Sequence, residues 1–145
     1  MVLSGHEATQ AEVANLFQQI VNHAKNIPKA HLIFIGCVPN PRNDHTFKEK
    51  FVALNRKLFK ISRKNRKTVT FLSVGNNFTH NGEVKIEFYK DLVDHCKREQ
   101  KREIENGKIV THPGKNTHLN FDGASMLTKM ILNKMNTLPK EYFKE

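Results

Sequence analysis

A single histidine near the C-terminal end of the chain stands in a segment rich in polar side chains. His118 lies within the segment KNTHLNFDGA, residues 115–124, just before a run of apolar residues at helical spacing. An imidazole in a loop before a helix is placed as a general base would be, because histidine exchanges protons near neutral pH. An ordinary loop histidine would occupy the same place, so the segment alone leaves both interpretations open.

A stretch in the middle of the chain carries cationic side chains at helical spacing. Apolar positions from Thr46 onwards alternate by four and three residues and predict one buried helix stripe; they are Phe47, Phe51, Leu54, Leu58 and Ile61. The basic positions centre roughly 160° from this stripe; they are Arg56, Lys57, Lys60, Arg63, Lys64, Arg66 and Lys67. Within this predicted helix almost no acidic residue follows Glu49, so the pattern predicts a phosphate-binding face. The alternative is that the cations at the helix end only complement the helix dipole.

Two further cationic groups are weaker candidates. The first is Lys97, Arg98, Lys101 and Arg102. Acidic residues interleave with it, which favours pairing on a solvated helix face. The second surrounds the histidine and consists of Lys108, His112, Lys115 and His118. With Gly114 in the loop and a helix N-terminus after it, this second group is suited to holding a phosphate.

Aromatic platforms for stacked bases are few in the sequence. Phe78, Tyr89 and Tyr142 are the candidates, and most of the other phenylalanines are expected in the core. Base-specific recognition of single-stranded RNA usually needs such platforms. We therefore expect binding mainly through the phosphate backbone, with a strong dependence on salt.

The overall charge favours a polyanionic partner. The chain has 145 residues, a net charge of +10 and a pI of about 9.8, which point to nucleic acid or an anionic surface unless the lysines serve solubility alone. No apolar run approaches the roughly 18 residues of a membrane span, and no secretion signal is visible. Cys37 and Cys96 lack metal-ligand spacing and suggest reduced thiols of an intracellular protein, with a disulfide between them left open. No metal or cofactor site is predicted.

Helices and strands alternate along the chain. The predicted elements are a helix from Ala8 to Lys25, a strand from His31 to Cys37, a helix from Thr46 (with Glu49 as capping box) to Asn65, a strand from Thr68 to Val74, a helix from Glu83 to Glu105, a short strand KIVT, the histidine loop, a helix from Asp122 to Asn136 and a peripheral tail over 137–145. This order predicts one α/β domain over residues 1–145, with helices flanking a layered, mostly parallel and narrow sheet. MVLSG is a further strand candidate, and so narrow a sheet suggests missing upstream strands or a partner chain.

The order of the motifs resembles the SGNH hydrolases, the GDSL-type esterases and lipases. VLSGHEA is similar to the Gly-x-Asn-Asp block, LIFIGCVPNPRND to the next strand with its Pro-Arg loop, and THLNFDGASMLTKMI to the last block. The resemblance spans nearly the whole chain and implies a flavodoxin-like α/β fold. It also implies that the loop with Arg42 lies near the loop with His118, because both flank the active-site edge in the family. Arg42 and Lys115 are therefore further candidates for nucleic-acid binding.

Departures from the family pattern concern the catalytic positions. The Gly-Asp-Ser block with the nucleophile is absent, and the chain begins at the third motif, so a truncated N-terminus is one explanation. Glu7 stands where the oxyanion-hole Asn is expected, and a carboxylate there would repel an oxyanion. Lys115 stands where the triad Asp is expected and cannot stabilise an imidazolium. By this resemblance His118 is a relic of the catalytic base and no residue is catalytic.

Three classes of function remain open. The OSK domain of the insect germ-plasm protein family Oskar resembles an SGNH hydrolase without its active site and is known to bind RNA, which favours an inactive RNA-binding module in cytoplasmic ribonucleoprotein granules. Some retrotransposon proteins carry SGNH-type esterase domains, which favours an esterase or acetylhydrolase with an upstream nucleophile. The third class is a protein-interaction or oligomerisation domain, in which a homo-oligomer, an upstream segment or a partner protein covers the sheet edge.

Overall fold

The computed structural model describes residues 2–3, 6–7, 9–42 and 45–139, and gives the backbone alone for 2–3, 6–7 and 45–48. The elements along the chain are β1 (Val2–Leu3), β2 (His6–Glu7), α1 (Gln10–Ala24), β3 (Leu32–Ile35), α2 (His45–Lys64), β4 (Val69–Leu72), the 3-10 helix η1 (Gly75–Asn77), β5 (Thr79–His80), β6 (Glu83–Val84), the 3-10 helix η2 (Ile86–Phe88), β7 (Tyr89–Asp91), α3 (Asp94–Glu105), β8 (Lys115–Leu119) and α4 (Phe121–Met135).

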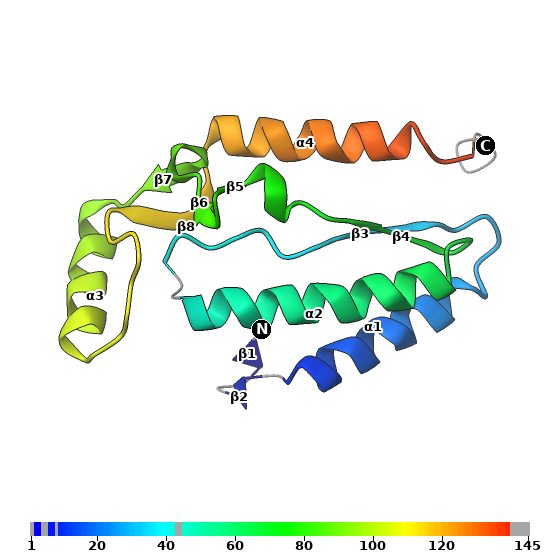
Figure 1. Cartoon of the computed structure of the whole chain (residues 1–145), viewed down its shortest axis with the longest axis horizontal. Helices are drawn as coiled ribbons and strands as arrows, with labels where there is room; N and C mark the ends of the chain where they lie inside the picture. Colours follow the sequence, from blue (N-terminus) through cyan, green and yellow to red (C-terminus); the bar gives the residue numbers. More distant parts are fainter. Residues whose placement is uncertain (1, 4–5, 8, 43–44, 140–145) are drawn as a thin grey trace.

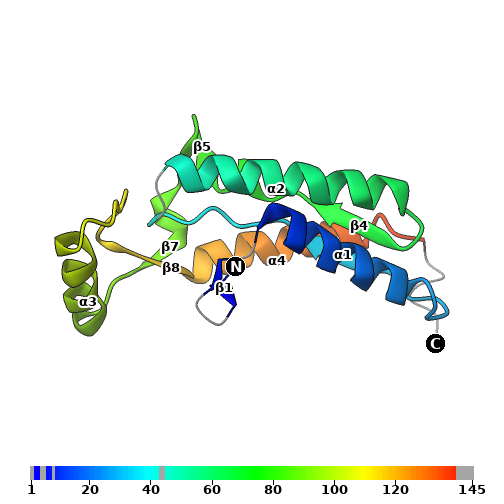
Figure 2. The ribbon, with the colours of Figure 1, turned by 90° about the horizontal axis from the view of Figure 1, so that it is seen from below.

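A parallel pair of strands forms the central layer. β3 and β4 pair in register from Leu32 opposite Val69 to Ile35 opposite Leu72. Helices α1 and α2 lie on one side of this pair and α4 lies on the other (Figure 1). The view turned by 90° agrees, with α1 and α2 in front and α4 behind (Figure 2). Short apolar strands covered on both faces are what continuous apolar runs predict.

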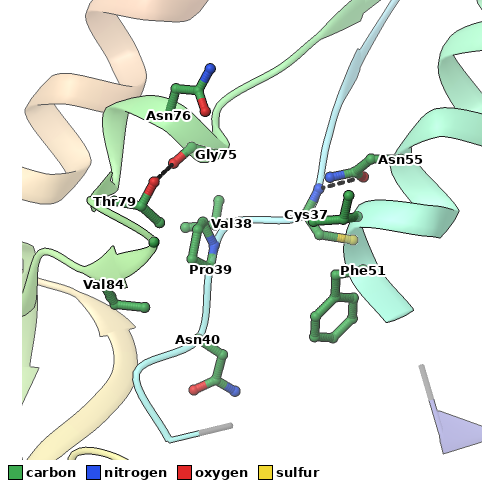
Figure 3. A pocket seen from close by; sticks show the side chains of 12 residues that line it. Cys37, Val38, Pro39, Asn40, Phe51, Asn55, Gly75, Asn76, Thr79 and Val84 are labelled. Carbon is green, nitrogen blue, oxygen red and sulfur yellow. Dashed lines mark hydrogen bonds between the residues drawn. The ribbon is translucent and has the colours of Figure 1, made fainter. Parts of the chain in front are cut away.

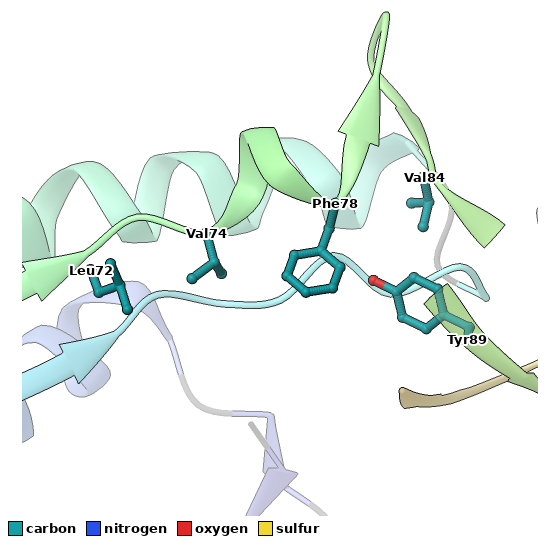
Figure 4. Packing of buried hydrophobic residues seen from close by; sticks show 5 residues of the cluster. All are labelled: Leu72, Val74, Phe78, Val84 and Tyr89. Atoms are coloured by element: carbon teal, nitrogen blue, oxygen red, sulfur yellow. The ribbon is translucent and has the colours of Figure 1, made fainter. Parts of the chain in front are cut away.

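Two hydrophobic clusters fill the spaces on either side of the strands. Phe17 and Val21 of α1 and Leu58 of α2 pack with Val69 on one side. On the other side a cluster of Leu72, Val74, Phe78, Val84 and Tyr89 (Figure 4) packs against Met126, Leu127, Met130 and Ile131 of α4. The helices are thus held by burial of one apolar stripe each, as their periodicity predicts.

Local signals set the ends of the helices that flank the strands. Thr9 is the N-cap of α1, and its hydroxyl accepts a hydrogen bond from the Glu12 amide at 3.1 Å in a capping box. Asn120 is the N-cap of α4 and accepts a hydrogen bond from the Gly123 amide at 2.9 Å. The Thr46 side chain of the predicted capping box of Thr46 and Glu49 lies outside the described side chains.

The predicted helix from Glu83 to Glu105 is wrong in its first half. Asn81 and Gly82, with φ of 50° and 79°, turn the chain between β5 and β6, and helix begins only at Asp94. An Asn-Gly pair with positive φ is the usual two-residue hairpin turn. Tertiary packing also overrides the helical spacing, because Val84 and Tyr89 are buried in the cluster beside α4.

The region around His118 is also different from the prediction. KIVT forms no strand, whereas Lys115–Leu119 forms β8, which pairs antiparallel with β7. His118 therefore lies in a strand and not in a loop. The strand is extended because Leu119 lies opposite Tyr89 and Lys115 lies opposite Asp91.

The architecture confirms a mixed α/β chain and corrects the expected sheet. Among the described strands, parallel pairing is confined to β3 and β4, and the other three pairings are antiparallel. The prediction of a mostly parallel sheet is therefore wrong. Within the described residues the prediction of a narrow sheet holds, because each sheet there has two strands.

Candidate nucleic-acid interface

The outer side of α2 presents its cations to solvent. Leu58 is buried and Leu54 and Ile61 pack beside it, so the opposite side of the helix faces outward. The exposed cations there and directly after the helix are Arg56, Lys57, Lys60, Arg63, Lys64, Arg66 and Lys67, and we call these seven residues the α2 cationic face. The described ion pairs include none of the first six of them.

A shallow cavity extends the α2 cationic face at its C-terminal end. The cavity has a volume of about 510 Å³ and lies between Lys25, at the end of α1, and residues 63–68. A neighbouring cavity of about 400 Å³ adds Lys29 and shares Lys25 and Lys67. Lys25 and Lys29 were not predicted, because only the packing of α1 on α2 brings them beside residues about forty positions later. The result is a concave surface lined by cations from two segments.

An exposed aromatic side chain lies within the same surface. Phe59 is 47% exposed, one helical turn from both Arg56 and Arg63. The Arg63 guanidinium carbon is 5.9 Å from the Phe59 ring centroid, within cation–π range. By contrast, the predicted platforms Phe78 and Tyr89 are 0% and 1% exposed, so that prediction is wrong, and Tyr142 lies outside the described residues.

The structure does not bring Arg42 and Lys115 to the α2 cationic face. Arg42 is bonded to Glu103 of α3, and Lys115 belongs to β8. Both α3 and β8 lie at the end of the molecule opposite the C-terminal end of α2 (Figure 1). Arg42 donates to Glu103 at 2.6 Å, and Lys115 pairs with Asp91 at 2.8 Å. The Lys115 ammonium lowers the pKa of the Asp91 carboxyl, first as a hydrogen-bond donor and then as a nearby charge. A phosphate at either cation would have to compete with a carboxylate already in place.

The remaining cations near β8 and α3 are also partly compensated. The Lys108 ammonium is 4.0 Å from Glu103, and the His112 ring is 4.0 Å from Glu83. On α3, Lys97 pairs with Asp94 at 3.8 Å. These contacts favour charge pairing for Lys97, Lys108 and His112. Arg98, Lys101 and Arg102 of α3 are exposed and belong to none of the described ion pairs.

His118 is exposed on β8. Its backbone amide donates to the Asn116 side chain at 3.1 Å, and within the described part of the chain its ring has no hydrogen bond or ion pair. Lys115, three residues earlier, is engaged by Asp91. The side chain of Glu7, the other departure from the hydrolase pattern, lies outside the described residues. The geometry therefore provides no acid that orients the His118 ring among the described side chains.

A small apolar cavity lies beyond the carboxyl ends of β3 and β4, where α/β domains usually bind ligands. It has a volume of about 220 Å³, and Figure 3 shows Cys37, Asn55 and Thr79 around it. Two of its polar side chains are already hydrogen-bonded: Asn55 accepts from the Cys37 amide at 3.3 Å, and Thr79 donates to the Gly75 carbonyl at 3.0 Å. Burial raises the pKa of the Cys37 thiol, which disfavours the reactive thiolate. The cavity is smaller than the roughly 300 Å³ of typical ligand sites.

Other kinds of site find no support in the part of the chain that the structure describes. No cluster of three or more His, Cys, Asp or Glu side chains is placed there to hold a metal ion. The described helices include none with the length and apolar character to cross a membrane. Comparison with protein-family models, curated proteins and solved structures found no match to this chain. The case for function thus depends on the side chains themselves.

Proposed function

We propose that this chain is an RNA-binding module that contacts mainly the phosphate backbone through the α2 cationic face. The observation that carries the proposal is the set of six cations there, Arg56 to Arg66, which no described carboxylate pairs. The surface continues into the cavity lined by Lys25 and residues 63–68. The proposal includes descent from a catalytically inactive SGNH hydrolase and a place in intracellular ribonucleoprotein granules, both resting on the motif resemblance alone.

The physical basis is the release of counterions. A nucleic-acid strand carries condensed cations, and each phosphate that a lysine or arginine neutralises sets one of them free. Cations already paired within the protein gain less, because the carboxylate must first be displaced. The six cations from Arg56 to Arg66, which no described carboxylate pairs, are therefore better suited to phosphates than Arg42 or Lys115. From Arg56 to Lys64 the helix rises roughly 12 Å, enough for more than one phosphate contact.

The test is a pair of charge reversals on this face. Lys60→Glu with Arg63→Glu should weaken binding to unrelated single-stranded RNAs about equally, because phosphate contacts carry no sequence information. The log–log slope of affinity against salt should become shallower by about 1.4, two contacts at roughly 0.7 each. Fluorescence anisotropy titrations at several salt concentrations, with RNA and DNA strands of the same length, measure both quantities.

A matched control separates local contacts from overall charge. Lys90→Glu with Lys129→Glu makes the same change in net charge at exposed positions on β7 and α4. This control should lose much less affinity and keep the wild-type slope. Equal binding by wild type and the Lys60/Arg63 variant at every salt concentration would contradict the proposal. Equal losses of RNA affinity in the Lys60/Arg63 and Lys90/Lys129 variants would mean that the face acts only through the net charge of the protein.

A protein-interaction or oligomerisation domain is the second candidate. It is favoured by exposed apolar side chains on and after α1, namely Leu16 at 43%, Ile20 at 54% and Ile27 at 49% exposure. The β3–β4 pair also has no further strand on either edge within the described residues. Self-association commonly buries strand edges without a partner and exposed apolar side chains of helices.

A further inference from the structure

We infer that Phe59 is a base-stacking platform, so that the α2 cationic face binds single-stranded nucleic acid with splayed bases in preference to duplex. The inference rests on the proposed function and adds a ligand class to it. A duplex keeps its bases stacked inside and offers only phosphates to a protein surface of this kind. A single strand offers both phosphates and open base faces, which stack on aromatic side chains.

The position of Phe59 is that of a platform within a line of charges. Val52, Arg56, Phe59 and Arg63 follow at intervals of four, three and four residues, so they lie along one side of α2. Phe59 is 47% exposed and Val52 is 51% exposed, and both arginines are exposed. A nucleotide stacked on the Phe59 ring would have its phosphates within reach of arginines one turn away in either direction.

The ring is also held in place from behind. Phe59 meets Phe71 of β4 edge to face, with 6.1 Å between ring centroids. Phe71 stacks on Phe34 of β3 at 5.9 Å, and Phe34 contacts Phe17 of α1 at 4.5 Å. This row of four rings runs from the buried contact with α1 to the surface at Phe59. A ring fixed in this way loses little conformational entropy when a base stacks on it.

Arg63 completes the arrangement on the solvent side. Its guanidinium carbon lies 5.9 Å from the Phe59 centroid, at the outer limit of a cation–π contact. The guanidinium can therefore move to a phosphate, or stack on the far side of a base, without losing a strong existing contact. An anionic membrane is the competing occupant, but binding there needs an apolar face buried about 5–10 Å deep, and Phe59 is half covered by its neighbours.

The test compares labelled oligo(U) with an abasic strand of equal length and charge. A duplex of the same length and vesicles containing phosphatidylserine are the other two probes. Wild type should bind oligo(U) about five- to a hundredfold more tightly than the abasic strand, the range that one stacked base gives. Phe59→Leu keeps an apolar contact with Phe71 but removes the ring face, so it should lower oligo(U) affinity to the abasic level. Its salt slope should equal that of wild type, because no cation is lost.

Phe121→Leu is the matched control, since Phe121 is 84% exposed at the start of α4, on the other side of the strands. It should bind like wild type, and Phe59→Tyr should retain the preference for oligo(U). Equal wild-type affinity for oligo(U) and the abasic strand, with a normal salt slope, would overturn the inference while leaving the proposed function standing. If the protein binds none of the strands, both the inference about Phe59 and the proposed RNA-binding function are wrong. Vesicle binding that depends on Phe59, without a base preference, would assign the surface to membranes.

Discussion

His118 stands exposed on β8, and its ring has no hydrogen bond or ion pair within the described residues. Lys115, at the position of a triad acid in the hydrolase resemblance, is paired with Asp91 at 2.8 Å. We expect no hydrolysis of short-chain p-nitrophenyl esters above that of the His118→Ala variant, because no described carboxylate would stabilise an imidazolium. Initial rates for the two proteins decide this. Turnover by wild type that vanishes with His118→Ala would restore the esterase interpretation.

Tyr89 and Phe59 show how burial decides the role of an aromatic residue. Tyr89 is 1% exposed and its hydroxyl donates to the Pro39 carbonyl. Burial raises the pKa of the Tyr89 phenol, so it remains a donor throughout the neutral range. Phe59, which the sequence pattern gave no reason to single out, is the ring left half exposed among cations. Its spacing, three residues after Arg56 and four before Arg63, puts it on the cationic side of the helix, but that spacing alone does not distinguish an exposed ring from a buried one.

At the scale of elements, the start of α4 is fixed by a close approach to η2. Asn120 donates through its amide side chain to the Glu87 carbonyl at 2.6 Å, and its backbone amide donates to the Phe88 carbonyl at 2.9 Å. A Cβ on Gly123 would collide with that same Phe88 carbonyl oxygen and lie 3.1 Å from the Leu119 side chain. Glycine is thus required here by packing and not by backbone conformation.

Gly123→Ala should therefore destabilise the fold by about 1–3 kcal/mol, as overpacking does. In an open helix position the same change would be favourable by roughly 1 kcal/mol, which makes a loss diagnostic. Gly75→Ala is the control, since nothing lies within 4 Å of a Cβ there, and it should stay within about 0.5 kcal/mol of wild type. Denaturant unfolding curves measure both. Equal stability of the two variants would contradict the close contact between α4 and η2.

For the whole molecule, the edges of β3 and β4 that no described strand pairs, together with the exposed apolar side of α1, lead to a prediction of self-association. We expect the chain to sediment faster than a monomer of 16.8 kDa at high protein concentration. Ile20→Glu should increase the monomer fraction, because it places a charge on the exposed apolar side that Leu16 and Ile27 share with it. Leu132→Glu, at a 52% exposed position on α4, is the control. Sedimentation velocity at several concentrations measures this, and a wild-type monomer throughout would refute it.

The sequence by itself determined the elements whose periodicity is local and strong. Apolar positions spaced by three and four gave α1, α2 and α4, and the two continuous apolar runs gave β3 and β4, because one buried face is enough to reveal each. The exposure of Arg56, Lys60 and Arg63 followed from the same stripe. The segment after Asn81-Gly82 was misread as helix, although that dipeptide is itself a hairpin signal.

Only the tertiary structure decided which side chains act together. Lys25 joins residues 63–68 because α1 packs on α2, and Glu103 neutralises Arg42 from 61 positions away. The parallel pairing of β3 with β4 likewise places Phe34 and Phe71 behind Phe59. Local periodicity tells which face of an element is buried, but not which distant residue meets it. Charge pairing and ring stacking are contacts between distant residues, so both were settled by packing.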